Sequence, residues 1–223
     1  MQVKLVSHSV VSQDFFEEHG KTTPQDLIAF CARVSNPKNQ NNKATADKLI
    51  KFLIDHKHWS PLEMVSACCE IVTTRDIARQ ILRHRSFSFQ EFSQRYSEAQ
   101  DFEFSEARLQ DTKNRQNSLE VEDDELQEWW RSAQQYISQI STDFYQQALD
   151  RGIAKEVARK VLPEGLTVSR MYMQGTLRSW VHYLQLRMGK ETQKEHREVA
   201  FAIAECIVKV FPLIENQIDP EKY

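Results

Sequence analysis

Glycine is scarce in this chain of 223 residues, which holds five glycines and none between Gly20 and Gly152. Phosphate-binding loops and dinucleotide-binding turns need several glycines within a few residues, because their backbone must approach the phosphate closely. The sequence therefore excludes both kinds of loop. Any phosphate group would have to be bound by arginines, by side-chain hydroxyl groups or by helix N-termini.

Cysteine motifs and long apolar runs are also missing. The four cysteines form no Cys-x-x-Cys pair and are Cys31, Cys68, Cys69 and Cys206. We expect buried, free thiols in the reducing cytoplasm and no metal site. No run is apolar enough for a signal segment or long enough to span a bilayer, so we expect no membrane partner. The net charge of −3 provides no general attraction for nucleic acid.

Apolar periodicity predicts an α+β protein in which short strands alternate with amphipathic helices. Strands are expected at residues 3–11, 63–74 and 167–174. Helices are expected to begin at Thr23, Ala44, Arg75, Ser118, Lys155, Leu177 and Gln193. Residues 97–118 are predicted to form a loop. No repeat or linker divides the chain, so we predict one domain over residues 1–223, whose tail at 212–223 is loosely packed.

The longest helical pattern covers residues 118–151 and ends before Gly152. Its apolar residues recur at helical spacing and are expected to face the core. They are Trp129, Ala133, Tyr136, Ile137, Ile140, Phe144 and Ala148. Apolar stripes at this spacing are far more often core than cofactor sites.

Residues 75–96 hold five arginines and no lysine. Arg75 and Arg79 are spaced as on one face of a helix, while the apolar residues of this segment fall on another face. Arginine favours planar partners such as phosphates and carboxylates. A solvated basic helix is the simple interpretation of any single arginine here. It is weaker for Arg83-His84-Arg85, because three adjacent cations repel one another unless an anion lies nearby.

A long motif that includes these residues resembles the signature of the flavin-dependent thymidylate synthases. It reads Arg83-His84-Arg85-Ser86-Phe87-Ser88-Phe89-Gln90-Glu91-Phe92-Ser93-Gln94-Arg95-Tyr96. Shorter elements resemble the same family, namely His58-Trp59-Ser60-Pro61-Leu62-Glu63, Ala158-Arg159-Lys160-Val161-Leu162-Pro163, the block from Leu177 to Arg187, and Gln193-Lys194-Glu195. The chain departs from the family pattern at Met64, Gln90, Thr176 and Glu191.

The resemblance implies an enzyme that converts dUMP to dTMP by reductive methylation. Methylenetetrahydrofolate would provide the carbon, NADPH the hydride, and FAD would carry the hydride. The resemblance also implies a mostly antiparallel sheet flanked by long helices. It further implies a homotetramer whose active sites combine residues from several subunits, and activation of dUMP without a covalent bond to the enzyme.

The resemblance also assigns roles to individual residues. The flavin would be bound by His58, Ser60, Glu63, Arg83, His84, Arg85, Glu91, Arg178 and His182. The substrate dUMP would be bound by Gln80, Arg83, Glu91, Phe92, Ser93, Gln94, Arg95, Arg159 and Arg187. Arg187 would be the catalytic residue, because a guanidinium beside a uracil carbonyl stabilises negative charge as hydride adds to the ring.

Other interpretations of the same residues remain open. Arginines interleaved with phenylalanines can form a single-stranded nucleic-acid-binding module, and a basic helix can bind an acidic protein partner. His56, His58 and Glu63 allow a metal site, but no further histidine or cysteine completes its ligands. Ser93 is a possible nucleophile, yet the sequence shows no His-Asp pair to activate it. We therefore assign Ser93 to substrate binding.

Overall fold

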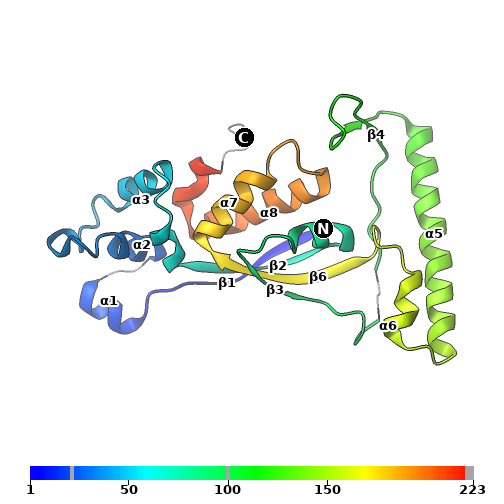
Figure 1. The fold of residues 1–223 in the computed structure, drawn as a ribbon, viewed down its shortest axis with the longest axis horizontal. Coiled ribbons are helices and arrows are strands. Elements are labelled where there is room, and N and C mark those ends of the chain that lie inside the picture. The colour runs from blue at the N-terminus through cyan, green and yellow to red at the C-terminus, as the bar shows by residue number, and fades with distance from the viewer. Residues whose placement is uncertain (21–22, 99–100, 219–223) are drawn as a thin grey trace.

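The centre of the molecule is a four-stranded antiparallel sheet (Figure 1). A computed structural model describes residues 1–20, 23–98 and 101–218. In spatial order the strands are β1 (Gln2–His8), β2 (Ser66–Thr74), β6 (Val168–Thr176) and β3 (Ser88–Glu91). The two central strands pair over nine residues each, from Ser66 opposite Thr176 to Thr74 opposite Val168. The expected α+β class with an antiparallel sheet is confirmed.

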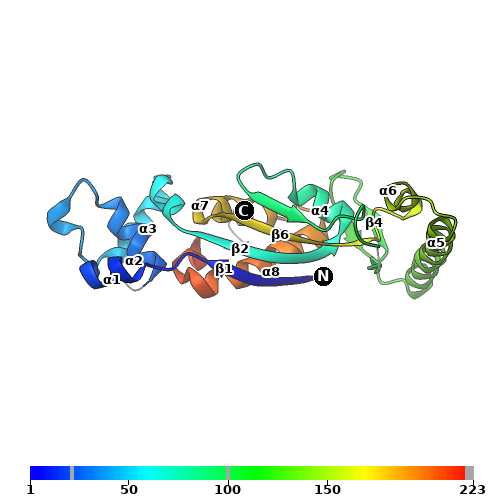
Figure 2. The same cartoon turned by 90° about the horizontal axis from the view of Figure 1, so that it is seen from below.

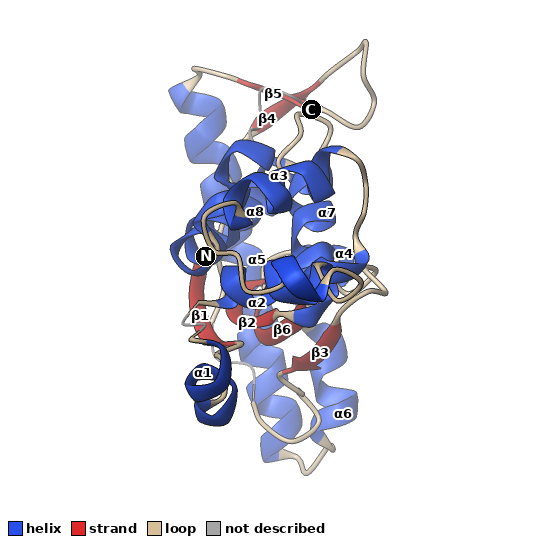
Figure 3. Ribbon diagram, turned by 90° about the vertical axis from the view of Figure 1, so that its left-hand side faces the viewer, coloured by secondary structure: helices blue, strands red, loops and turns tan. Residues whose placement is uncertain are grey.

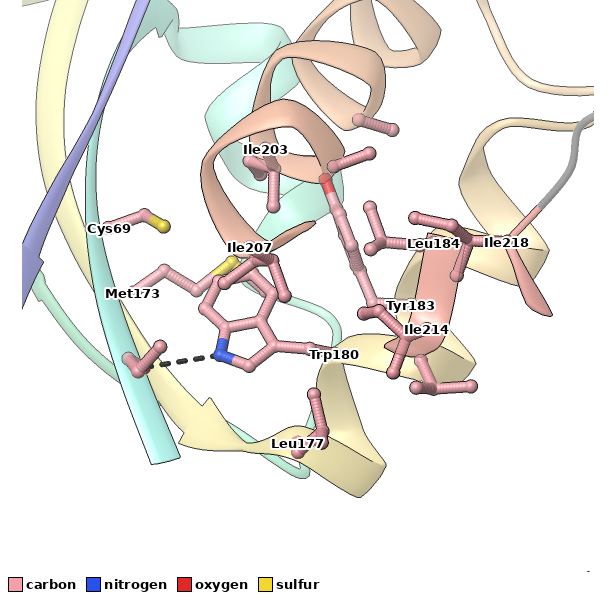
Figure 4. Close-up of a cluster of buried hydrophobic side chains, with 14 of the residues drawn as sticks. Cys69, Met173, Leu177, Trp180, Tyr183, Leu184, Ile203, Ile207, Ile214 and Ile218 are labelled. Atoms are coloured by element: carbon pink, nitrogen blue, oxygen red, sulfur yellow. Dashed lines mark hydrogen bonds between the residues drawn. The ribbon is translucent and has the colours of Figure 1, made fainter. Parts of the chain in front are cut away.

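One face of this sheet carries the hydrophobic core. Residues of β2 and β6 alternate between buried and less buried positions, as strands covered on one side do. The covering helices are α7 (Leu177–Arg187) and α8 (Lys194–Val210). Figure 4 shows Met173, Trp180 and Ile207 packed between sheet and helices, where all three are fully buried. The indole N–H of Trp180 donates to the Ala67 carbonyl at 3.2 Å, so its polar atom has a partner.

Two helical groups lie at opposite ends of the molecule (Figures 1 and 2). One end holds α1 (Gln13–His19), α2 (Pro24–Ala32) and α3 (Ala46–Asp55). The other holds α5 (Asp124–Asp150) and α6 (Lys155–Ala158), while α4 (Arg75–Ile81) follows β2 directly. The expected start of α2 is confirmed: Thr23 Oγ1 accepts from Asp26 N at 3.1 Å and Asp26 Oδ2 accepts from Thr23 N at 3.3 Å.

The segment expected to be a loop contains a hairpin, β4 (Arg108–Gln110) and β5 (Ser118–Glu120). The hairpin lies at the same end of the molecule as α5 and α6 (Figure 1), and in the view from the α1 end it is at the top while α6 is at the bottom (Figure 3). The helix after it begins later than predicted, at Asp124, because Asp123 caps it by accepting from Leu126 N at 3.0 Å. The loop prediction is therefore wrong for residues 108–110 and for Ser118, and its residues 99–100 lie outside the described residues.

The predicted inward stripe of α5 is wrong for four of its seven residues, whereas Ala133, Ile140 and Ala148 are half-buried. Trp129, Tyr136, Ile137 and Phe144 each expose between 50% and 67% of their surface. The face that turns inward is polar, because two glutamines of α5 bind the extended chain beside it. Gln134 exchanges two hydrogen bonds of 2.9 Å with the backbone of Ser105, and Gln127 binds the backbone of Ala107 through both amide atoms in the same way.

The described part of the predicted tail is packed into the core. A 3₁₀ segment, Pro212–Gln217, follows α8, and Ile214 and Ile218 are both buried. The expectation of loose packing is wrong for these residues, since their apolar side chains cover α7 and α8 (Figure 4). Residues 219–223 of that prediction lie outside the described residues.

A tight contact at Gly175 provides a test of this packing. A Cβ atom at this position would lie 2.6 Å from Cε1 of Phe87, whose ring is packed edge-on against Trp180 with centroids 4.7 Å apart. We expect Gly175→Ala to lower the free energy of unfolding by about 1–3 kcal/mol, measured by urea unfolding. Gly165→Ala is the control, because a Cβ there meets nothing within 4 Å. Equal effects of the two substitutions would contradict the prediction.

Candidate active site

The row of arginines on α4 is partly neutralised within the chain. Glu164 accepts from Nε of Arg75 at 3.4 Å and also accepts from Nε of Arg79. Burial alone would raise the pKa of Glu164, but the two guanidinium groups outweigh it and hold that pKa below its usual range. These two arginines therefore have the carboxylate partner that their spacing predicted, and they leave little charge for a ligand.

Arg83 and Arg85 differ from this pair, because they lie in the turn after α4 and are exposed. Within residues 1–20, 23–98 and 101–218, neither forms an ion pair with a carboxylate. Two guanidinium groups two residues apart repel each other at neutral pH. Such a pair suits an anionic ligand with two adjacent charges, and the diphosphate of a dinucleotide has this form. These residues therefore fit a ligand that carries a diphosphate group.

His84 lies between these two arginines in sequence and contacts a third in space. Arg187 is the last residue of α7, and its Nε donates to Nε2 of His84 at 2.9 Å. Burial, together with the charges of Arg187 and Arg83, lowers the pKa of His84 to about 4. A neutral imidazole can accept this hydrogen bond, so His84 fixes the direction of the Arg187 guanidinium.

Gln80 lies one turn before this contact and reaches the same region. Its Oε1 is 3.2 Å from Nδ1 of His196, whose Nε2 is 3.0 Å from the hydroxyl of Tyr183. The ring of Tyr183 meets that of His84 edge-on at 4.9 Å. The structure thus brings together Gln80, His84 and Arg187, which we call the Arg187 cluster. Sequence reasoning missed His196 and Tyr183, because a histidine and a tyrosine on apolar helix faces are usually core residues.

The burial of His196 predicts how the stability of the protein depends on pH. Burial lowers the pKa of His196 to about 3, whereas an unfolded histidine titrates near 6.5. Unfolding therefore takes up a proton below pH 6.5, and the stability that the neutral histidine provides is lost as the pH falls from 6.5 towards 3. We expect the free energy of unfolding of wild type to fall by up to about 2 kcal/mol more than that of Tyr183→Phe/His196→Leu between pH 7.5 and pH 5, measured by urea unfolding. A difference in free energy of unfolding between the two proteins that does not change with pH would contradict this prediction.

A second group of predicted residues lies at the other end of α7, and we call it the Arg178 cluster. Arg178 forms an ion pair with Glu63 of the 3₁₀ segment Ser60–Met64. His182 lies one turn further and meets the ring of Trp59 edge-on at 4.4 Å. Burial lowers the pKa of His182, and the charge of Arg178 adds to this effect. The cluster also includes two exposed residues just before Glu63, namely His58 and Ser60.

A third group follows β3 and lies beside α6, and we call it the Arg95 cluster. Glu91 accepts from Ser169 Oγ at 2.8 Å and lies 3.7 Å from Nη1 of Arg75. Arg95 Nε lies 3.4 Å from Glu156 Oε2 on α6, which brings the chain after β3 close to the helix that leads into Arg159. The remaining members of the cluster are Phe92, Ser93 and Gln94. Phe92 lines a cavity of about 340 Å³, and Gln94 is buried. The Oγ atom of Ser93 accepts a hydrogen bond from the backbone N–H of Arg95.

The three clusters do not form one pocket within a single chain. Arg178 and Arg187 are nine positions apart on α7, which corresponds to about 13 Å along a helix. The Arg178 cluster lies towards α3, whereas the Arg95 cluster lies at the α6 end (Figure 1). Residues that the sequence analysis assigned to one flavin and one nucleotide are therefore distributed over much of the length of the molecule.

Thiol and metal chemistry have little support in the described residues. All four cysteines are free, and burial raises the pKa of the Cys69 thiol to about 12. A thiol with this pKa is protonated at neutral pH and is a poor nucleophile. The described part of the chain holds no cluster of three histidine, cysteine, aspartate or glutamate residues placed to bind a metal ion. Among its helices, none is both long and apolar enough to cross a membrane.

Comparisons with known proteins agree with the motifs. Residues 4–213 match the family model described as thymidylate synthase complementing protein. A flavin-dependent thymidylate synthase from Synechocystis sp. is 53% identical over 197 residues, which cover 88% of this chain and 90% of that protein. A probable flavin-dependent thymidylate synthase from Paramecium bursaria Chlorella virus 1 is 46% identical over 220 residues, covering 98% and 99% of the two chains.

The fold also has a solved counterpart. The crystal structure of a UMP/dUMP methylase, PolB from Streptomyces cacaoi, bound with 5-Br dUMP, superimposes with a TM-score of 0.82. The two proteins are 26% identical, and the match covers 97% of this chain and 93% of that chain. The same methylase bound with 5-Br UMP gives a TM-score of 0.75.

Proposed function

The chain belongs to the flavin-dependent thymidylate synthase family, and we propose that it catalyses the reductive methylation of dUMP to dTMP. In this reaction methylenetetrahydrofolate provides the carbon and leaves as tetrahydrofolate. NADPH provides the hydride and is oxidised to NADP⁺, while one proton is taken up. The flavin, which we propose is FAD, relays that hydride when bound. The observation that carries the proposal concerns Arg83 and Arg85, which have no carboxylate partner among the described residues. His84, which lies between them in sequence, accepts a hydrogen bond from Arg187.

The Arg187 cluster supports the chemical step. Hydride addition to the pyrimidine ring moves negative charge onto a carbonyl oxygen, and a guanidinium held beside that oxygen stabilises the charge. The hydrogen bond to neutral His84 takes up Nε of Arg187 and leaves both terminal nitrogens for the substrate. Arginine stays charged at any physiological pH, so Arg187 acts as an electrostatic partner and not as a general acid.

No covalent bond between enzyme and dUMP is part of this proposal. Ser93 accepts a hydrogen bond from the backbone N–H of Arg95 at 3.3 Å, and no histidine among the described residues bonds to it. A serine without a base is a weak nucleophile. Cys69 is held as a neutral thiol by burial. We therefore expect Ser93→Ala to raise the KM for dUMP with little change in kcat, measured in steady-state assays. A loss of kcat alone would contradict a binding role.

The remaining predicted residues have roles in binding. We propose that Arg83 and Arg85 contact the flavin diphosphate, with His84 beside them. We propose that the Arg178 cluster contacts another part of the flavin, through His58, Ser60, Glu63, Arg178 and His182. The Arg95 cluster, together with Gln80 and Arg187, would bind dUMP. Ser169 donates to the carboxylate of Glu91 and Arg75 lies beside it, so this carboxylate has a defined place from which it would contact the ligands.

Shared active sites in a homotetramer would bring these clusters together. Two observations support this proposal. First, the clusters are separated within one chain, while the flavin and the pyrimidine must meet for hydride transfer. Second, α5 exposes the apolar stripe of Trp129, Tyr136, Ile137 and Phe144. Exposed apolar surface of this extent on a soluble protein is typical of protein interfaces.

The stripe provides a test of the assembly. We expect Ile137→Glu to convert the tetramer into smaller species, because a carboxylate in an apolar interface loses its hydration. Dissociation would also remove turnover, since each site would lack residues from its neighbours. Light scattering after size-exclusion chromatography measures the assembly. Gln135→Glu adds the same charge at another exposed position of α5 and is expected to leave the tetramer intact. A monomeric wild type would contradict the shared-site proposal.

The proposed activity is tested first by visible absorption. We expect purified protein to show a flavin spectrum that bleaches under anaerobic NADPH with dUMP present. Adding methylenetetrahydrofolate should then yield dTMP, which is measured by chromatography of the nucleotides. UMP is the matched comparison substrate, because it differs from dUMP by one hydroxyl group. The proposed activity would be contradicted if the protein bound no flavin after incubation with FAD. Salt-dependent binding of single-stranded oligonucleotides by such a flavin-free protein would support the nucleic-acid-binding alternative.

A further inference from the structure

A line of hydrogen bonds runs from the core to the surface beneath the Arg187 cluster. The Tyr183 hydroxyl is 3.0 Å from His196 Nε2, and His196 Nδ1 is 3.2 Å from Gln80 Oε1. Gln80 Nε2 donates to Gln193 Oε1 at 2.8 Å, and Gln193 Nε2 donates to Glu195 Oε2 at 3.0 Å. The line thus joins α7 and α8 to α4, which lies about a hundred residues earlier in the sequence, through side chains alone.

The surface end of this line has a fixed polarity. Glu195 is held by Arg108 of the β4–β5 hairpin, whose Nη2 lies 2.6 Å from Glu195 Oε1. Burial would raise the pKa of Glu195, but hydrogen bonds from its own backbone N–H, from Arg108 and from Gln193 outweigh it, and the pKa lies below its usual range. The group is therefore an ionised carboxylate at neutral pH, and an ionised carboxylate only accepts hydrogen bonds.

This polarity determines every other group in the line. Because Glu195 accepts, the amide of Gln193 must turn its NH₂ towards Glu195 and its oxygen towards Gln80. Gln80 must then turn its own NH₂ towards Gln193 and its oxygen towards His196. His196 consequently carries its proton on Nδ1, and its Nε2 accepts from the hydroxyl of Tyr183.

The core end of the line cannot reverse this order. His196 is fully buried, and burial lowers its pKa to about 3, so the ring stays neutral and keeps one donor and one acceptor. Burial also raises the pKa of Tyr183, so its hydroxyl keeps its proton. Rotating the Gln80 amide by half a turn would place its NH₂ against the Nδ1–H of His196 and its oxygen against the oxygen of Gln193. Both contacts would lose a hydrogen bond, which costs more when the groups are buried.

We propose that Tyr183 and His196 are positioning residues that hold the Gln80 amide in one orientation, with its second N–H directed at an acceptor oxygen of dUMP. The inference rests on the proposed function, which assigns Gln80 to the substrate. Gln80 is half-buried, and within the described chain only one of its two amide N–H groups has a partner. An amide held this way donates to a carbonyl or phosphate oxygen of the ligand without first losing rotational freedom.

A purely structural role is the competing explanation, and it predicts different behaviour. A buried tyrosine–histidine pair that serves only packing would affect stability and would alter dUMP binding equally with or without the Gln80 amide. A pair that acts through Gln80 loses its effect on dUMP once that amide is absent. The two explanations are separated by a double-mutant cycle.

The cycle uses Tyr183→Phe/His196→Leu and Gln80→Leu, with the dissociation constant of dUMP measured by calorimetry on flavin-loaded protein. The paired substitution replaces both buried polar groups by apolar ones, so neither of them is left without the other as its partner. Only Oε1 of the half-buried Gln80 loses its hydrogen bond. We expect it to weaken dUMP binding about tenfold in the wild-type background, which corresponds to the worth of one oriented hydrogen bond. In the Gln80→Leu background we expect less than a twofold effect.

Each outcome decides between the possibilities. Equal effects in both backgrounds would overturn the positioning role and leave the substrate assignment of Gln80 intact. No effect of Gln80→Leu on dUMP would show that Gln80 does not contact the substrate, and would overturn the inference through the proposed function instead. Tyr172→Phe is the matched control, because it removes a tyrosine hydroxyl that binds Glu70 on the exposed side of β6. It is expected to leave dUMP binding unchanged.

Discussion

Replacing Arg187 with alanine is expected to lower kcat for dTMP formation by roughly 10²–10³-fold, while the flavin stays bound. The loss follows from the removal of a preorganised positive charge at the place where negative charge develops. The flavin should remain, because Arg187 lies at the C-terminal end of α7 and its described partner is His84. The measurement combines single-turnover dTMP formation with the visible spectrum of the same sample.

Two further variants sharpen the test of Arg187. Arg187→Lys keeps a positive charge but lacks the Nε atom that His84 binds, so we expect partial activity and a weaker dependence on His84. Arg131→Ala removes an arginine that is exposed on α5 and paired with Glu128, and it should behave as wild type. Loss of flavin together with activity in Arg187→Ala would place this residue in the cofactor site and contradict the catalytic assignment.

Replacing Arg83 with alanine is expected to yield colourless protein with little bound flavin. Arg83 is exposed and has no carboxylate partner in the described chain, so its charge is available to a phosphate. A hydrogen bond to a charged group is worth about 1.5–3 kcal/mol, which corresponds to a roughly 10- to 100-fold loss of affinity. The flavin-to-protein absorbance ratio after identical purification measures the effect.

Arg79→Ala is the matched control for Arg83→Ala. It removes an arginine from the same stretch, but one that already pairs with Glu164. We therefore expect Arg79→Ala to retain its flavin. Full flavin loading of Arg83→Ala, or an equal loss of flavin in both variants, would contradict the role proposed for the Arg83-His84-Arg85 turn.

Much of the fold was predicted correctly where one segment decides its own structure. Pro24 after Thr23 predicted the start of α2, and the expected capping hydrogen bonds are present. The helical spacing after Leu177 predicted α7, and the β-branched residues before Arg75 predicted β2. The motif that begins at Arg83 predicted the family, which the comparisons confirm. The roles of its individual residues stay predictions, because no ligand tests them.

The errors arose where a pattern is compatible with two environments. The apolar stripe with Ile137 on α5 has the spacing of a core helix, yet an interface between subunits has the same spacing. The polar face turned inward because Gln127 and Gln134 bind the backbone of the segment before the β4–β5 hairpin, and no periodicity reveals such contacts. Ile214 and Ile218 are buried because α7 and α8 offer an apolar surface to them.

The sequence by itself determined the central strands, most of the helices and the family, and its motifs carry the predictions of the site residues. These properties depend on neighbouring residues, through backbone preferences, apolar periodicity and an ordered motif. Only the tertiary structure decided which arginines are neutralised within the chain, which proton His196 carries, and how the predicted site divides into three clusters. These properties depend on hydrogen bonds and charges between groups on different elements, such as His84 and Arg187, which are 103 residues apart. Their partners are chosen by the packing of the sheet and helices, which no local pattern specifies.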